Sequence, residues 1–292
     1  MKSLATCLLA LVLPIVAQAT DYRYREIYYP GSANTALYAI NDLRHYVGAE
    51  KAQDGAHHAI IGHGATLQHI DPDGLIGQAK ESWAFSINAR GDIAGVYVDA
   101  TDVTHGYLRH AGGRVEEIAY PGGFDTEAFG VNNFGVVIGL YTDAEGNAHA
   151  FKRTDGVYEN IDVAGGLVTV PLSINDWGQV AGEYVKTPDT AGFGYIQYPG
   201  GRTTFHTAPG SAPEQSYFIS INNRRDVLGT YTDEAGATHN FIRQGGAYVP
   251  FTIPDSFGAA FFSAQTINNR QDVVGYYVDA ANVAHGFVAR AD

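Results

Sequence analysis

Short apolar runs, each ended by a polar turn, recur along the whole chain. Between residues 217 and 254 the apolar runs YFISIN, VLGTYT, HNFIR and YVPFTIP are separated by the polar turns NRRD, DEAGA and QGG. Runs of this length, rich in β-branched and aromatic residues and bounded by Asp, Asn and Gly, predict four successive β-strands joined by tight turns. No stretch shows a 3.6-residue apolar period over ten or more residues, so the pattern predicts an all-β protein.

The same four-strand pattern occurs six times. Each copy contains an Ile/Val-Asn pair, here called the anchor pair, and successive anchor pairs are 43 to 47 residues apart. Eight residues after the anchor Ile or Val stands a glycine in all six copies, and ten residues after it a tyrosine in five. A histidine follows eighteen residues after it, also in five copies. The anchor pairs are Ile40-Asn41, Ile87-Asn88, Val131-Asn132, Ile174-Asn175, Ile221-Asn222 and Ile267-Asn268.

Six antiparallel units of this size predict a six-bladed β-propeller with four strands in each blade. The last copy has no fourth strand, because the chain stops soon after its third run. The segment YREIYYPGS (24–32), which precedes the first anchor pair, matches fourth-strand segments such as VEEIAYPGG (115–123). We therefore expect the N-terminal strand to complete the last blade, which closes the ring and removes an exposed sheet edge.

The unit SINNRRDVLGTYTDEAGATHNF (220–241) resembles the HAF-type extracellular repeat, a family of exported bacterial proteins. The His-x-Phe motif of that family stands here as HGF, HAF and HNF, and the resemblance covers essentially all of the chain after its first residues. The first unit (YAINDLRHYVGAE) and the fourth depart most from the pattern. The resemblance implies export and a propeller-like fold. It implies no general activity, so no catalytic residue follows from it.

The first nineteen residues have the pattern of a signal peptide. Lys2 precedes an apolar run from Leu4 to Val16 that is too short to span a bilayer, and Ala17-Gln18-Ala19 follows as a cleavage site. We expect residues 1–19 to be removed near Ala19 and residues 20–292 to form a single domain in the periplasm or outside the cell. Cys7 is the only cysteine and lies in the signal peptide, so neither disulfides nor thiol chemistry are expected.

The chain carries a formal net charge of −13. An acidic surface repels phosphate backbones and anionic lipids, which argues against nucleic-acid or membrane-surface partners. No further apolar run has membrane-spanning length, so we expect no membrane insertion. The sequence shows no phosphate-binding loop and no catalytic triad, and we expect a monomer without a cofactor.

The repeated polar residues are interpreted as parts of the scaffold. An Asn before a tight turn commonly bonds its own backbone. Histidines on neighbouring blades lie about 10 Å apart and cannot share a zinc ion at about 2 Å, so we expect them to bond backbone, Tyr or Asp groups. The hairpins DAEGN (143–147) and DEAG (233–236) lack the full ligand set of a calcium loop. No metal site is expected. Turn capping accounts for the aspartates at the equivalent hairpin positions, which are Asp99, Asp143, Asp233 and Asp279.

One column of the repeat varies where its neighbour is nearly constant. The position five before the anchor is Ser or Thr in five copies, whereas the position four before it holds Ala36, Trp83, Glu127, Val170, Tyr217 and Ser263. We expect this column at one mouth of the central channel. The two longest loops that lead into the innermost strands, 72–82 and 208–216, precede blades that lie opposite each other. The predicted ligand-binding residues are Lys80, Trp83, Glu127, Gln215 and Tyr217.

Three functions remain open from the sequence. Aromatic platforms with a few charged and amide groups favour a binding protein for a glycan, a cell-wall fragment or a protein surface. A glycosidase would need two carboxylates about 5–10 Å apart, and a polysaccharide lyase would need a Tyr or His base near a cation such as Lys80. The candidate catalytic carboxylates are Glu81, Asp125, Glu127 and Glu214. The third function is a scaffold for extracellular protein assembly. The alternative to a binding role for Trp83 and Tyr217 is that they only cover the core between blades.

Overall fold

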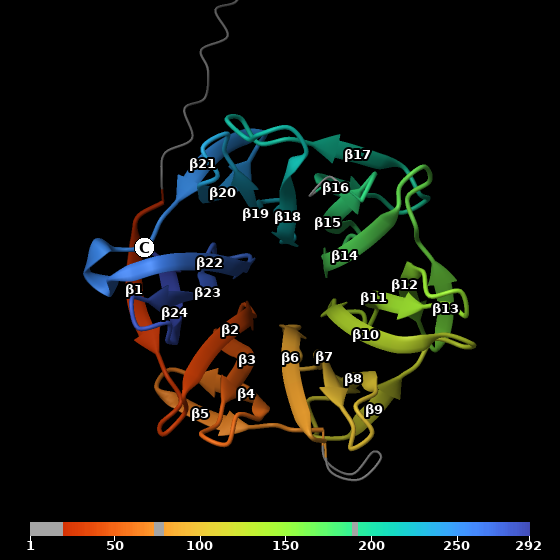
Figure 1. Cartoon of the computed structure of the whole chain (residues 1–292), viewed down its shortest axis with the longest axis horizontal. Helices are drawn as coiled ribbons and strands as arrows, with labels where there is room; N and C mark the ends of the chain where they lie inside the picture. The colour runs from red at the N-terminus through yellow and green to blue at the C-terminus, as the bar shows by residue number, and fades with distance from the viewer. Residues whose placement is uncertain (1–19, 73–78, 189–191) are drawn as a thin grey trace, which may run out of the picture.

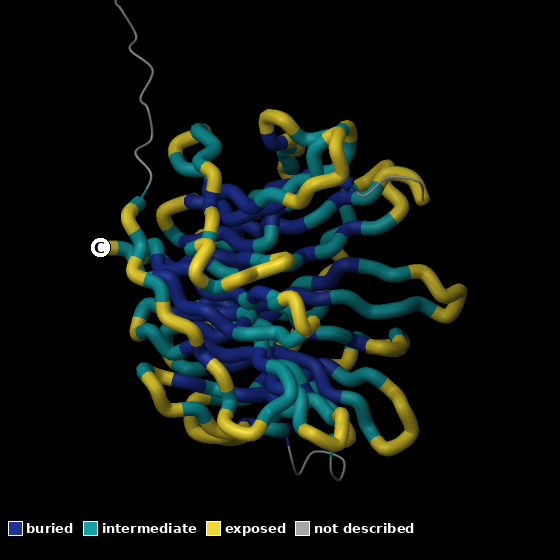
Figure 2. Tube along the Cα trace, turned by 60° about the vertical axis from the view of Figure 1, so that its left-hand side comes forward, coloured by how far each residue is buried: buried dark blue, intermediate teal, exposed yellow. Residues whose placement is uncertain are grey.

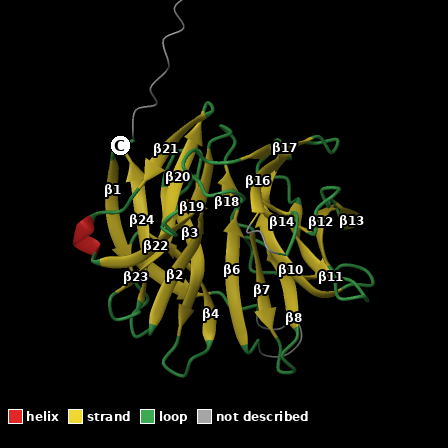
Figure 3. Cartoon of the chain, turned by 45° about the horizontal axis from the view of Figure 1, so that its top comes forward, coloured by secondary structure: helices red, strands yellow, loops and turns green. Residues whose placement is uncertain are grey.

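The computed structural model describes residues 20–72, 79–188 and 192–292 of the chain. The predicted signal peptide and residues 73–78 of the first long loop lie outside these ranges. The described chain is almost entirely β-strand with short turns, and its one helical element is the 3-10 turn Asp255–Phe257 (Figure 3). No helix within these ranges has the length and apolar character needed to cross a membrane. The prediction of an all-β protein is confirmed.

The strands form six blades around a central channel (Figure 1). Blade 1 consists of β2 (Asn34–Ile40), β3 (His45–Lys51), β4 (His57–His63) and β5 (Thr66–His69). Blade 2 consists of β6 (Glu81–Ile87), β7 (Ile93–Val98), β8 (Thr104–Arg109) and β9 (Val115–Ile118). Blade 3 consists of β10 (Phe124–Val131), β11 (Val137–Thr142), β12 (Ala148–Thr154) and β13 (Val157–Asn160).

The second half of the ring repeats this order. Blade 4 consists of β14 (Val168–Ile174), β15 (Val180–Val185), β16 (Gly192–Gln197) and β17 (Thr203–His206). Blade 5 consists of β18 (Gln215–Ile221), β19 (Val227–Thr232), β20 (Thr238–Gln244) and β21 (Ala247–Phe251). Blade 6 consists of β22 (Ala259–Ile267), β23 (Val273–Asp279), β24 (Ala284–Ala291) and the N-terminal β1 (Tyr22–Ile27). A short parallel pairing of β16 with β18 also joins the sheets of blades 4 and 5.

The ring closes by pairing the two ends of the chain, as expected. Strand β1 runs antiparallel to β24, from Tyr22 opposite Ala291 to Ile27 opposite Gly286. The strand begins two residues before the predicted segment 24–32 and ends at Ile27, because Pro30 and Gly31 lie in the turn that leads to blade 1. A second contact also joins the first and last blades, because Arg44 of blade 1 donates through two nitrogens to the buried carboxylate of Asp272 in blade 6.

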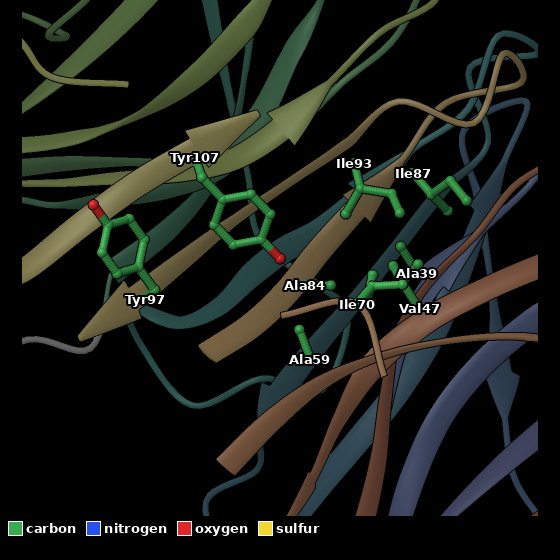
Figure 4. Close-up of a cluster of buried hydrophobic side chains, with 9 residues drawn as sticks. All are labelled: Ala39, Val47, Ala59, Ile70, Ala84, Ile87, Ile93, Tyr97 and Tyr107. Carbon is green, nitrogen blue, oxygen red and sulfur yellow. The ribbon is translucent and has the colours of Figure 1, made fainter. Parts of the chain in front are cut away.

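The hydrophobic core consists of six clusters, one between each pair of neighbouring blades. The cluster between blades 1 and 2 packs Val47 and Ile70 against Ile93, Tyr97 and Tyr107 (Figure 4). The buried positions lie in the strands, while the hairpins at the rims are exposed (Figure 2). Because each blade is buried on both faces by its neighbours, the inner strands carry nearly continuous apolar runs.

Each innermost strand carries a β-bulge at the same place. The pairing register with the second strand shifts between the third and the first residue before the anchor in all six blades. The bulged residue is therefore the one two positions before the anchor. A bulge redirects a side chain that regular alternation would place elsewhere, and here it supplies the wall of the channel.

Candidate ligand site in the central channel

A cavity of about 300 Å³ lies on the axis, at the end of the channel where the innermost strands finish. The six bulged residues form its wall: Tyr38, Phe85, Phe129, Leu172, Ile219 and Gln265. Phe85 lies between Tyr38 and Phe129, with ring centroids 5.4 and 5.8 Å away, so blades 1 to 3 present a continuous aromatic arc. The opposite half of the wall is aliphatic, apart from Gln265. The cavity therefore has one aromatic side.

The anchor asparagines form a closed ring around the axis. The side-chain amide of each donates to the backbone carbonyl of the next anchor asparagine, from Asn41 to Asn88 and on to Asn268, which donates back to Asn41, over 2.9–3.2 Å. Each Oδ1 accepts two N–H groups of its own turn; for Asn41 these come from Leu43 and His45. The predicted turn bonding is confirmed. The bonds between blades show that these residues also hold the ring together.

A second polar ring follows one residue later, at the mouth of the cavity. Its members are Asp42, Ala89, Asn133, Asp176, Asn223 and Asn269. In five of the six steps, a backbone N–H in one blade donates to the side chain in the next, as Asn133 does to Asp176 at 2.9 Å. The carboxylate of Asp176 also accepts the side-chain amides of Asn133 and Asn223.

Ala89 interrupts this second ring, because it has no side chain that can accept the N–H of Asp42. In the part of the chain that the structure describes, that N–H has no hydrogen-bond partner. The carboxylate of Asp42 accepts only from Asn269, whereas that of Asp176 accepts from two asparagines. Asp42 therefore presents an unpaired backbone N–H and a carboxylate that can accept a further hydrogen bond at one point of the mouth.

The rim outside the second ring carries exposed apolar residues. Phe134 and Trp177, from neighbouring blades, are 71% and 62% exposed, and Leu43 occupies the equivalent place in blade 1. The indole Nε1–H of Trp177 donates to the carbonyl of Asn223 in blade 5 at 2.9 Å, which fixes the orientation of the ring. Rigid exposed aromatics beside a polar ring are a common feature of binding surfaces.

At the other mouth, the predicted residues of blade 2 make contacts mainly within the rim. Lys80 forms an exposed ion pair with Asp102 of the neighbouring hairpin. The ring of Trp83 lies 5.0 Å from that of His57 in blade 1, and His57 is bonded to Glu81 at 2.6 Å. Trp83 thus lies against blade 1 and is not part of the axial cavity wall.

The other predicted residues come from blades 3 and 5. Burial raises the pKa of Glu127, and the nearby Asp125 raises it further. Glu214 and Gln215 lie where blade 5 meets blade 4, and the carbonyl of Glu214 accepts the N–H of Gly192. Blades 2 and 5 lie on opposite sides of the channel, so Trp83 and Tyr217 come from opposite walls (Figure 1).

Glu183 of β15 is a titratable group that the sequence did not single out. Burial raises the pKa of Glu183 to about 7. Burial also raises the pKa of Tyr217, and the nearby Glu183 and Tyr276 raise it further. Glu183 pairs across the strands with Val170, in the variable column. The signal was present in the sequence as an acidic residue inside the apolar run VAGEYV, where the other blades carry uncharged residues.

The repeated histidines bond aspartates, as expected. In four blades the Nε2 atom lies 2.8–3.2 Å from the hairpin aspartate: His105, His149, His239 and His285. Each of these rings also stacks on the tyrosine of its blade. The hairpin aspartates accept backbone N–H groups, which confirms turn capping. Within the described ranges, no three or more His, Cys, Asp or Glu side chains are grouped to hold a metal ion.

Comparisons with known proteins define the class of fold. No family model matches the chain, and no curated protein matches it. The Aleuria aurantia lectin, a fungal lectin with a six-bladed β-propeller fold, is 10% identical over 92% of this chain and 91% of its own, with a TM-score of 0.53. AofleA from Arthrobotrys oligospora is 12% identical over 91% of this chain and 86% of its own, with a TM-score of 0.57.

A third similar structure is TolB from Acinetobacter baumannii. It is 11% identical over 90% of this chain and 65% of its own, with a TM-score of 0.53. The protein is a six-bladed β-propeller. At identities of this level the similarity establishes the fold alone, and a function has to be argued from the residues of this chain.

Proposed function

We propose that this protein is an exported, monomeric, non-catalytic propeller that binds a glycan at the channel mouth formed by the second polar ring. The observation that carries the proposal is the combination of exposed Phe134 and Trp177 with the interrupted step of the second polar ring, where the N–H of Asp42 has no acceptor. A sugar ring has apolar C–H faces that pack on aromatic rings, and each hydroxyl can donate and accept. The adjacent N–H and carboxylate of Asp42 match one hydroxyl in both roles.

Two further features support this proposal. The Aleuria aurantia lectin, which shares the fold, recognises fucose. The N-terminal pattern of Lys2, an apolar run and Ala17-Gln18-Ala19 is typical of export, which would bring the protein to extracellular or cell-wall glycans. The residues predicted from the sequence, Trp83 and Tyr217 above all, form a second candidate position at the opposite mouth.

The substitution Ala89→Asn tests the proposed site. The new side chain can accept the N–H of Asp42, as Asn133, Asn223 and Asn269 accept in their blades. We expect unchanged or slightly raised thermal stability, since one hydrogen bond adds roughly 0.5–1.5 kcal/mol. Glycan binding should fall about tenfold or more on a glycan array and in calorimetry. The double variant Phe134→Ala/Trp177→Ala should also lose binding.

The matched control is the double variant Trp83→Ala/Tyr217→Ala at the opposite mouth. If that variant loses glycan binding while Ala89→Asn keeps it, the ligand binds at the mouth predicted from the sequence. The same glycans are assayed for released reducing or unsaturated ends. Release that depends on Glu127 or Glu183 would establish the enzyme alternative, whereas binding to no glycan at all would contradict the proposed function.

A further inference from the structure

Blade 5 departs from the other blades at its histidine. The Nδ1 atoms of His58, His105, His149 and His285 lie 2.6–3.0 Å from a carboxylate on or just after the outermost strand: Asp71, Glu117, Asp162 and Glu26 respectively. In blade 5 the two equivalent places hold Pro250, opposite Phe241, and Thr252, two residues later. Among the described residues, Nδ1 of His239 has no hydrogen-bond partner. Its side chain is 43% exposed, against 19–30% for the other four.

Blade 6 departs from the others at the position five residues before its anchor, which contacts the residue after His239. Five blades place a Ser or Thr five residues before the anchor, and its hydroxyl accepts a backbone N–H, as Thr126 does from Tyr120. Blade 6 has Phe262 at this position. The residue after the histidine, which is Ala or Gly in the other blades, is here Asn240, and its amide bonds the backbone of Phe262 and Ala264.

A cavity of about 220 Å³ lies at the rim of blade 5, where these two departures meet. It is lined from both faces of the blade, since Tyr231, Phe241 and Tyr248 belong to the cluster between blades 4 and 5 and Phe251 and Phe262 to the cluster between blades 5 and 6. Aromatic rings and prolines make up most of its lining: Pro209, Tyr231, Phe241, Tyr248, Pro250, Phe251 and Phe262. Its size is below the usual range of about 300–1,000 Å³ for drug-sized ligands, so it has room for a single ring. The glycan binding proposed above does not use this cavity.

The free nitrogen of His239 is a hydrogen-bond acceptor. The hydrogen bond from His239 lowers the pKa of Asp233, and the backbone N–H groups of Ala237 and Ala235 lower it further. An ionised carboxylate can only accept, so Nε2, 2.8 Å away, carries the ring proton. In the neutral ring, Nδ1 then has a free lone pair on the side of the missing carboxylate.

We propose that the cavity at the rim of blade 5 is a binding site for one aromatic ring that carries a single O–H or N–H donor, such as a phenol or an indole. The aromatic walls pack against the ring, and Nδ1 of His239 accepts its donor. Besides this nitrogen, the uncommitted polar side-chain groups are few, mainly the hydroxyls of Tyr231, Thr238 and Thr252. A sugar would bury several hydroxyls here without partners, which costs about 1–3 kcal/mol for each.

The test measures binding of p-cresol, indole and toluene to the full mature chain by ligand-observed NMR and calorimetry. Toluene matches p-cresol in shape but has no donor. We expect p-cresol to bind about tenfold more tightly than toluene, the effect of one hydrogen bond of roughly 1.4 kcal/mol. Thr252→Asp places a carboxylate where blades 1 and 3 have Asp71 and Asp162. It should abolish the preference, because the carboxylate favours a protonated ring whose Nδ1–H donates to it, and the acceptor lone pair is lost.

Three variants serve as comparisons. His239→Phe should also abolish the preference, and it should fold because blade 4 has Phe193 at the equivalent position. His105→Phe in blade 2, whose Nδ1 is already bonded to Glu117, and Ala89→Asn at the channel mouth should leave the preference unchanged. Melting temperatures of all variants show whether each one folds.

Three results would overturn the proposal: no binding of p-cresol or indole to the unaltered chain, an unchanged preference in both Thr252→Asp and His239→Phe, or displacement of p-cresol by methyl α-fucoside. None of these results affects the glycan proposal at the channel mouth, because Ala89→Asn tests that site separately.

Discussion

The glycine eight residues after each anchor has a steric cause. A Cβ atom at any of the six positions would lie 1.8–2.7 Å from the backbone carbonyl oxygen of the residue four before the anchor. At Gly139 the obstructing atom is the carbonyl oxygen of Glu127, at 1.8 Å. The obstruction common to all six copies is therefore the backbone of the innermost strand, and in four copies an aromatic ring of the third strand also lies within 3 Å, as Phe151 does at Gly139. This explains why the glycine is constant while the side chain opposite it varies from Ala36 to Trp83.

Gly139→Ala should destabilise the protein strongly. Backbone atoms must move to admit the new methyl group, and overpacking at a buried site costs roughly 1–3 kcal/mol or more. We expect a loss of at least about 3 kcal/mol in the free energy of unfolding, measured by urea denaturation, or failure to fold. Gly112→Ala is the control, because no atom lies within 4 Å of its added Cβ. A change below 1 kcal/mol for Gly139→Ala would contradict the steric explanation.

Several residue roles could be predicted from the sequence, because six copies provide an internal comparison. The turn bonds of the asparagines and the His–Asp pairs follow from residue type and spacing. The ring of bonds from one asparagine to the next blade could not be predicted, since it depends on how closely the blades approach the axis. The interruption at Ala89 becomes visible only when the bonds of the second polar ring are known.

At the scale of the elements, the strand order could be predicted but the bulge could not. All six innermost strands contain the same extra residue, so comparing the copies reveals no irregularity. The sequence predicts the variable column of Trp83, Glu127 and Tyr217 at the mouth where the chain enters the innermost strands. The bulge brings the column two positions before the anchor onto the cavity wall, including Phe85 and Phe129. The predicted residues lie at the opposite end of the innermost strands from this cavity, and ligand binding there stays a prediction.

Burial of Glu183 between blades gives a pH-dependent prediction. Its pKa is about 7 in the folded protein and about 4.3 in an unfolded chain. Between these values the folded state binds more protons, so stability falls as the pH rises through this range and stays lower above it. Glu183→Gln removes this loss. The difference in the free energy of unfolding between the variant and the unaltered protein should shift by about 1–3 kcal/mol in favour of the variant from pH 4.5 to pH 8, measured by urea denaturation.

The control for this prediction is Glu145→Gln on the exposed hairpin of blade 3, which removes one negative charge at the surface. A difference between Glu183→Gln and the unaltered protein that is the same at both pH values would show that Glu183 gains no proton on folding.

At the scale of the whole molecule, the count of blades followed from the six anchor pairs, and the closure of the ring followed from the fourth strand that the last copy lacks. That prediction succeeded because a sheet edge with unpaired N–H and C=O groups is costly and prone to aggregation. The position of the cavity at the rim of blade 5 could not be predicted in this way. It depends on two departures, Phe262 and the missing carboxylate beside His239, which lie in different copies and meet only in three dimensions.

Removal of the closing strand should open the ring. A variant that begins at Tyr28 lacks β1 and exposes the edge of β24 over the six residues that β1 pairs, and it also exposes the cluster that contains Ile27. We expect the melting temperature to fall by more than about 10 °C and light scattering to show association through the free edge.

A synthetic peptide of residues 20–32 should restore the melting temperature in a concentration-dependent way. The same peptide with Ile27→Asp should not, because Ile27 is only 4% exposed in the closed ring. A monomeric variant that melts at the original temperature would show that the inner contacts, such as Arg44 with Asp272, close the ring without the outer strand.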